Sequence, residues 1–289
     1  MMDAKIGILF AITAMLSWGV GDFLAKKAID KIGYAKSMMI NLLASFGPIL
    51  IYAILFPRIP AMSVELVLLV VVTAVFSAIG YFYFYKGLEK GNVSVVSPIS
   101  SSWAVVTTSL ATVIFKEVLT SFQVVGIMIV FVGIFLASTN LRELRKSISH
   151  GMSNGASEAI IAMIGWGITF ALAKPLVDMT GPAMTLLFMR GGSFLFVFSW
   201  TRIVGTRLTI PERSITLFLI VSGLLDTLGF LAYNLGVTTA FVSIVSPIAA
   251  TFPAVTIVLA YIFLKERVVN SQKVGIVAIL AGLILISLV

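Results

Sequence analysis

The stretch Val96-Ser97-Pro98-Ile99 occurs again as Val245-Ser246-Pro247-Ile248, 149 positions later. Each copy lies early in a run of about 20 apolar residues, the length with which an α-helix crosses a bilayer. Proline has no amide proton, so each copy also interrupts the hydrogen bonding of its predicted helix. A polar, proline-containing tetrapeptide repeated inside two apolar runs indicates an internally duplicated membrane protein.

The repeat extends over nearly all of both halves. The matching positions are Trp18-Gly19 with Trp166-Gly167, Gly33 with Gly181, Gly80 with Gly229, Gly87 with Gly236, Lys116-Glu117 with Lys265-Glu266, and Gln123, Gly126 and Gly133 with Gln272, Gly275 and Gly282. The offset changes only from 148 to 149 along the chain. Chance similarity between two apolar sequences would not keep polar, glycine and proline positions in register.

The composition agrees with a membrane protein. Of 289 residues, 60% are hydrophobic and 11% are charged, whereas a soluble domain has about 25% charged residues. The mean hydropathy is +1.12, which also excludes a disordered chain. There is no cysteine and only one histidine, so disulfides, thiol chemistry and zinc-thiolate sites are excluded, and we expect no metal site and no cofactor.

Ten apolar runs are predicted to span the membrane, and they leave no connection long enough for a soluble domain. Their predicted ranges are 6–25, 35–56, 64–85, 93–115, 123–138, 157–176, 182–204, 214–235, 241–264 and 272–289. Five spans form a first repeat over 1–140, a basic linker covers 141–156, and five form a second repeat over 157–289. Because five is odd, the two repeats cross in opposite senses, as in many secondary transporters. The predicted fold is an all-α integral membrane protein of ten transmembrane helices in two inverted five-helix repeats.

The basic residues support this topology. Side A, with the N-terminus and the even-numbered connections, carries Lys5, Arg58, Lys116 and Lys174. Side B carries Lys26, Lys27, Lys31, Lys36, Lys86, Lys90, Arg142, Arg145, Lys146, Arg202, Arg207, Arg213, Lys265, Arg267 and Lys273. Basic residues concentrate in cytoplasmic loops, so we expect side B to be cytoplasmic and both termini extracytoplasmic. The net charge of +8 is then a topology signal, and no nucleic-acid partner is expected.

Taken together, these features resemble the EamA family of the drug/metabolite transporter superfamily. The resemblance rests on the ten spans, the repeat, the two Trp-Gly pairs, the two Lys-Glu pairs and the Gln-x-x-Gly that follows each of them. It implies export or exchange of small metabolites, often amino acids, through a central cavity by alternating access. It also implies that spans 1–4 and 6–9 line the cavity. Arg190, in span 7, matches a position at which the family pattern has an arginine.

Three ionisable residues fall inside predicted spans, where charge is costly and often functional. Arg190 is expected either to bind a substrate carboxylate or to form an internal ion pair with Asp226. Asp22 and Asp226 are candidates for binding a substrate amino group, a proton or a cation. For Asp22 the alternative is an interfacial carboxylate paired with Lys26, four residues further on.

Aromatic and polar residues complete the predicted substrate site. Trp18 and Trp166 are expected to pack or to line the centre, and Tyr81, Tyr85 and Tyr233 to stack on a substrate, with Asn234 as a hydrogen-bonding neighbour. Ser97 and Ser101 belong to a polar stripe of span 4 that either lines the cavity or bonds to other helices. Pro98 and Pro247 are predicted hinges, with a static kink as the alternative.

The leading hypothesis is therefore a secondary transporter of small metabolites in the plasma membrane, coupled to a proton or another cation. A membrane-embedded lipid-modifying enzyme and a passive channel are the alternatives, although we find no cluster of acids or histidines near one interface. The paired glycines of spans 5 and 10 either pack against each other or form a homodimer face, so we expect a monomer or a weak homodimer.

Overall fold

The computed structural model of the chain describes residues 2–55, 60–90, 96, 99–138, 155–203, 211–263 and 269–287. Among these residues, all regular secondary structure is helical. The first half contains α1 (Met2–Ile32), α2 (Tyr34–Leu55), α3 (Val64–Lys90), α5 (Trp103–Ile114) and α6 (Ser121–Ser138). The second half contains α8 (Ala156–Thr180), α9 (Pro182–Ile203), α10 (Arg213–Thr239), α11 (Val242–Ala249), α12 (Phe252–Phe263) and α13 (Asn270–Ser287). The predicted basic linker lies almost wholly outside the described residues.

Every predicted span corresponds to described helix, but not every one is long. In the described part of the chain, seven helical segments are long and apolar enough to cross a membrane. The helices of predicted spans 4, 5 and 10 are apolar but shorter, over Ile99–Ile114, Ser121–Ala137 and Asn270–Ile286. A multi-pass membrane protein is confirmed in this sense, while the count of ten crossings stays a prediction.

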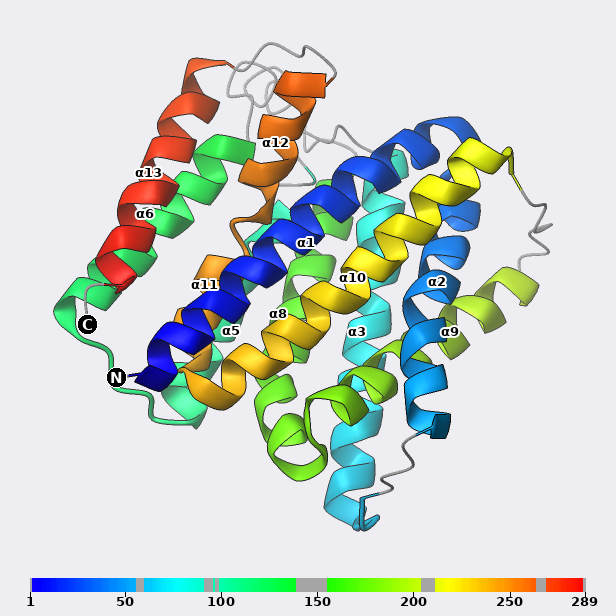
Figure 1. Cartoon of the computed structure of the whole chain (residues 1–289), viewed down its shortest axis with the longest axis horizontal. Helices are drawn as coiled ribbons and strands as arrows, with labels where there is room; N and C mark the ends of the chain where they lie inside the picture. The colour runs from blue at the N-terminus through cyan, green and yellow to red at the C-terminus, as the bar shows by residue number, and fades with distance from the viewer. Residues whose placement is uncertain are drawn as a thin grey trace.

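The helices pack across the two halves in a twofold pattern. α1 runs along α10, and its counterpart α8 runs along α3. In the same way α2 contacts α10 while α9 contacts α3, and α6 pairs with α13 at the edge of the bundle (Figure 1). Each half therefore buries its apolar faces mainly against the other half.

Both residues of each Trp-Gly pair contact the other half at this interface. A Cβ atom added to Gly229 of α10 would lie 2.5 Å from Nε1 of Trp18, and one added to Gly80 of α3 would clash with the indole of Trp166. The glycines beside the two indoles also accept matching hydrogen bonds. Thr107 Oγ1 donates to the carbonyl of Gly167 (2.8 Å), and Thr256 Oγ1 donates to that of Gly19 (3.0 Å). The repeated motif is thus a close-packing device between helices.

The turns at the ends of the first helix of each half are also equivalent. Gly33 has φ 79° and Gly181 has φ 82°, a left-handed conformation in which glycine is favoured because it lacks a Cβ atom. α1 continues to Ile32, well beyond the predicted end at residue 25. Asp22 therefore lies well inside a long helix, whereas the predicted span ended only three residues after it.

Predicted span 9 is not one helix. α11 and α12 are separated at Ala250–Thr251, next to Pro253, whose missing amide proton cannot bond the carbonyl of Ala249. Pro247 lies inside α11, and the helix continues past it. The first half has the same interruption at Ser102, where no proline follows, with the amide of Ser102 bonding the carbonyl of Ile99 (3.2 Å). The break therefore occurs in both halves, although a proline follows it in only one of them.

The glycines of α6 and α13 pack against each other within the chain. Added Cβ atoms at Gly126 and Gly282 would lie 2.9 and 2.7 Å from each other's carbonyl oxygens. Gly133 and Gly275 face each other in the same way. The intramolecular interpretation is confirmed, and this small-residue face is not available to a second copy.

We predict that Gly275→Ala destabilises the fold by about 1–3 kcal/mol, because overpacked sites force helices apart. The added carbon would clash with the backbone of Ala137, which cannot move like a side chain. Gly47→Ala is the matched control, since nothing lies within 4 Å of its added carbon. Thermal unfolding in detergent measures both. Equal stability of the two variants would contradict the close α6–α13 contact.

Candidate functional site

A cavity lies in the middle of the bundle, between the two halves. It contains about 490 Å³ of space not filled by atoms, part of which is open to solvent. The described residues that line it are Trp18, Asp22, Tyr81, Phe84, Tyr85, Trp103, Trp166, Phe170, Asp226, Phe230 and Phe252. The walls are therefore aromatic, and the only ionisable acids among these residues are two aspartates.

The repeat builds these walls from equivalent positions. Trp18 and Trp166 are equivalent, and so are Trp103 with Phe252 and Tyr81 with Phe230. Each pair contributes one residue from each half, so the cavity straddles the pseudo-twofold axis. Such a position between inverted repeats is where transporters of this general plan hold their substrates.

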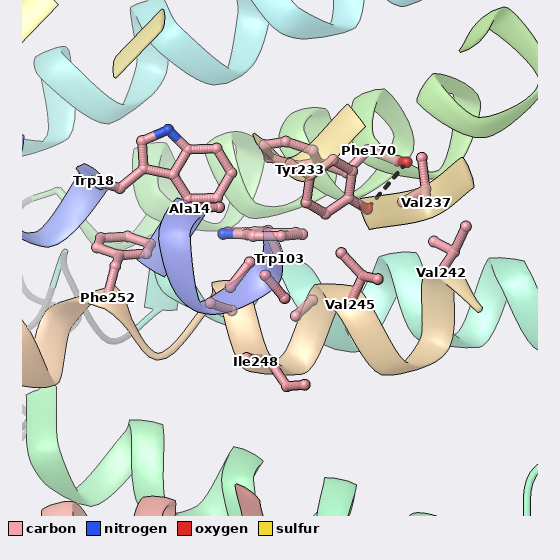
Figure 2. Close-up of a cluster of buried hydrophobic side chains, with 14 of the residues drawn as sticks. Ala14, Trp18, Trp103, Phe170, Tyr233, Val237, Val242, Val245, Ile248 and Phe252 are labelled. Carbon is pink, nitrogen blue, oxygen red and sulfur yellow. Dashed lines mark hydrogen bonds between the residues drawn. The ribbon is translucent and has the colours of Figure 1, made fainter. Parts of the chain in front are cut away.

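The interrupted helices position two of the aromatic side chains. Trp103 and Phe252 directly follow the break of their span. The Trp103 ring stacks on Phe170 with centroids 4.1 Å apart, and the Phe252 ring lies 6.2 Å from that of Trp18. Figure 2 shows these side chains gathered from α1, α5, α8 and α12. The break thus helps to form the cavity wall.

Arg190 and Asp226 form a buried ion pair beside the cavity. Arg190 Nη2 lies 2.5 Å from Asp226 Oδ2, with side-chain exposures of 1% and 15%. The guanidinium also lies 3.9 Å from the centre of the Phe230 ring. Tyr81 and Ser45 donate to the same Asp226 oxygen, at 3.2 and 3.3 Å. The internal pair considered from the sequence is present, and it is supported by a cation–π contact.

Asp22 differs from Asp226 in having no such partner. It lines the cavity from α1, one helical turn from Trp18. Among the described residues, no ion pair or hydrogen bond reaches its carboxylate. The side chain of Lys26, considered above as its partner, lies outside the described residues. The cavity therefore has one carboxylate more than Arg190 can neutralise.

Comparison with known proteins identifies the family. The profile of the EamA-like transporter family matches residues 5–139 and again 153–288. The chain belongs to the EamA-like transporter family. The two matched segments are the two repeats, as the sequence predicts.

Relatives of this EamA-like protein agree with the assignment. An uncharacterized transporter of Archaeoglobus fulgidus is 23% identical, over 97% of this chain and 98% of its own. An uncharacterized protein of Methanocaldococcus jannaschii is 31% identical over 133 residues, which are 45% of this chain and 95% of its own. One crystal structure superimposes over 98% of both chains with a TM-score of 0.78 at 14% identity, which shows a shared fold.

Several residues predicted for the site of this EamA-like chain do not line the cavity. Tyr233 is fully buried with its hydroxyl 2.8 Å from Ser246 Oγ. Asn234 donates from Nδ2 to the carbonyl of Pro182 (3.1 Å) and so ties α10 to α9. Ser101 is buried but is not among the lining residues. Ser97 and Pro98 lie outside the described residues. Tyr233 and Asn234 are therefore packing residues in this structure.

The cavity is also lined by four phenylalanines that were not predicted from the sequence, namely Phe84, Phe170, Phe230 and Phe252. Apolar residues in an apolar span carry no signal of their own. The repeat would have found three of them, because Phe170, Phe230 and Phe252 are the equivalents of Asp22, Tyr81 and Trp103. Matching each site residue to its equivalent in the other repeat would therefore have identified these three phenylalanines from the sequence alone.

We predict that Arg190→Met and Asp226→Asn each destabilise the protein strongly, because removing one partner of a buried pair costs about 3–5 kcal/mol. The double variant is expected to recover much of this loss, since no uncompensated charge remains. Unfolding midpoints in detergent give the double-mutant cycle. The exposed Arg202 of the same helix provides the control Arg202→Met. Losses that simply add in the double variant would contradict the pairing.

Proposed function

We propose that this protein is a secondary transporter that exports or exchanges small metabolites across the plasma membrane by alternating access around the central cavity. The observation that carries the proposal is the cavity itself, which is lined by equivalent residues of two inverted halves. Tilting of one half opens a site on the pseudo-twofold axis to one side of the membrane. The equivalent tilt of the other half opens the same site to the opposite side.

The contacts between the halves at the two ends of the bundle fit such rocking. At one end, the Glu117 carboxylate accepts the amides of Val242 and Ser243, each at 2.9 Å, at the start of α11. At the other end, Lys90 of α3 lies 2.7 Å from Glu158 of α8, and the Lys90 side chain is 48% exposed. Both ties join the first half to the second, and both are polar contacts that water can replace.

The cavity supports a substrate with an ionised amino group, such as an amine or an amino acid. Asp22 offers a carboxylate, and the aromatic walls suit the apolar part of a small metabolite. The same carboxylate is our candidate for binding a coupling proton or cation. The Arg190–Asp226 pair serves mainly to hold α9 against α10 beside the site.

Counterflow in proteoliposomes tests the transporter. Vesicles loaded with one unlabelled metabolite are expected to accumulate the same labelled metabolite above equilibrium, which a passive channel does not do. A panel of amines, amino acids and other small metabolites is assayed with and without a pH gradient, and empty vesicles give the background. No counterflow of any solute, together with chemical change of a lipid headgroup, would favour the enzyme alternative.

Sidedness is tested with single cysteines, because the chain has no native cysteine. We expect Ser149→Cys, in the basic linker, to be protected in intact cells from a membrane-impermeant maleimide, because basic loops stay in the cytoplasm. Thr120→Cys, at an exposed position between α5 and α6, is expected to react. The reverse labelling would place side B outside.

A further inference from the structure

We propose that the cavity selects an amphipathic monocation, an organic amine with a flat apolar body and no carboxylate. This inference rests on the proposed transport function and names its substrate class. It follows from how charge and aromatic surface are distributed over the two halves of the cavity.

The negative charge lies on one side of the cavity. Asp22 of α1 and Asp226 of α10 both line it, and these two helices run side by side. Their equivalents in the other half are Phe170 of α8 and Ser77 of α3. The α3–α8 side instead presents Tyr81, Phe84, Tyr85, Trp166 and Phe170. Trp18 and Phe230 add aromatic surface on the α1–α10 side, so both sides are aromatic and only one of them is acidic.

The pairing of Arg190 decides which charge the cavity accepts. Its guanidinium contacts Asp226 and the faces of Tyr81 and Phe230, and the side chain is almost fully buried. Arg190 lies beside the cavity, and no basic side chain is among the described residues that line it. A substrate carboxylate would meet Asp22 without a free cation to balance it, and like charges brought together strongly disfavour a wrong ligand.

An organic cation satisfies both sides at once. Its ammonium group would pair with the Asp22 carboxylate, and its body would stack on the α3–α8 side, where Trp and Tyr faces also attract cations. An amino acid has the same ammonium and body but adds the unfavourable carboxylate. The geometry therefore predicts discrimination between an amino acid and its decarboxylated amine.

A matched ligand panel tests this on the full-length protein. Binding of 2-phenylethylamine, phenylalanine, 2-phenylethanol and 3-phenylpropionate is measured in detergent by titration calorimetry. We expect 2-phenylethylamine to bind about tenfold or more tightly than the other three, because only it pairs with Asp22 without adding an anion. Phenylalanine or 3-phenylpropionate binding as tightly as the amine would overturn the proposal.

The role of Asp22 is tested by Asp22→Asn, which keeps the shape of the side chain and removes its charge. We expect amine binding to weaken about tenfold or more. Asp178→Asn is the matched control, because Asp178 lies in α8, pairs with Lys174 and does not line the cavity. Unchanged amine binding in a folded Asp22→Asn variant would overturn the proposal. If that variant does not fold, the ligand panel on the unaltered protein decides alone.

A counterflow assay tests the substrate class separately from the proposed transport function on which it rests. The trimethylated form of 2-phenylethylamine is permanently charged, so it does not leak through lipid and is suitable for counterflow. Counterflow of this cation, but not of phenylalanine, supports the inference. Counterflow of neutral or acidic metabolites without the cation would overturn the inference and leave the transporter intact. No counterflow of any solute would overturn the transporter itself.

Discussion

The contact of each indole with a glycine of the opposite half is the interaction on which the rest of the structure depends. Trp18 packs on Gly229 and Trp166 packs on Gly80, so α1 can approach α10 and α8 can approach α3. In a bilayer, lipid chains are as apolar as leucine, and helices associate through close packing rather than through a hydrophobic effect. Glycine provides that closeness, and the indoles on it form part of the cavity wall.

The frame is symmetric, whereas the polar groups on it are not. In the repeat, Asp22 is equivalent to Phe170, Asp226 is equivalent to Ser77, and Arg190 is equivalent to Asn41. Asn41 accepts a hydrogen bond from Tyr81 (2.9 Å), and Tyr81 also lies within hydrogen-bond distance of Asp226. The equivalents of the charged residues are thus neutral. One of these equivalents, Asn41, supports the ion pair through Tyr81. In the mechanism that we propose, the symmetry provides the alternation between sides, and its loss in the lining provides the preference for one class of substrate.

Much of this was readable from the sequence because membrane helices must be long, apolar and internally hydrogen-bonded. The repeat, its inversion and the family followed from residues such as Trp18, Gly126 and Glu117, whose spacing recurs. Asp22, Asp226, Trp18, Trp166, Tyr81 and Tyr85 were predicted for the site, and all six line the cavity. Charge and large aromatic rings are conspicuous in an apolar span, so they can be selected without knowing the packing.

Other features were decided only by tertiary structure. Whether Arg190 faces a substrate or Asp226 depends on how α9 meets α10, and a sequence contains no such distance. The break at Ser102 is followed by no proline, whereas its counterpart in the second half is followed by Pro253. Tyr233, which was predicted to stack on a substrate, is buried, and Phe170, which was not predicted, lines the cavity, because burial depends on which helix face meets a neighbour. The sequence by itself determined the internal repeat, through matching positions in the two halves, and the helices, through local length and hydrophobicity. Only the tertiary structure decided which carboxylate Arg190 pairs with, because pairing depends on contacts between residues far apart in the chain.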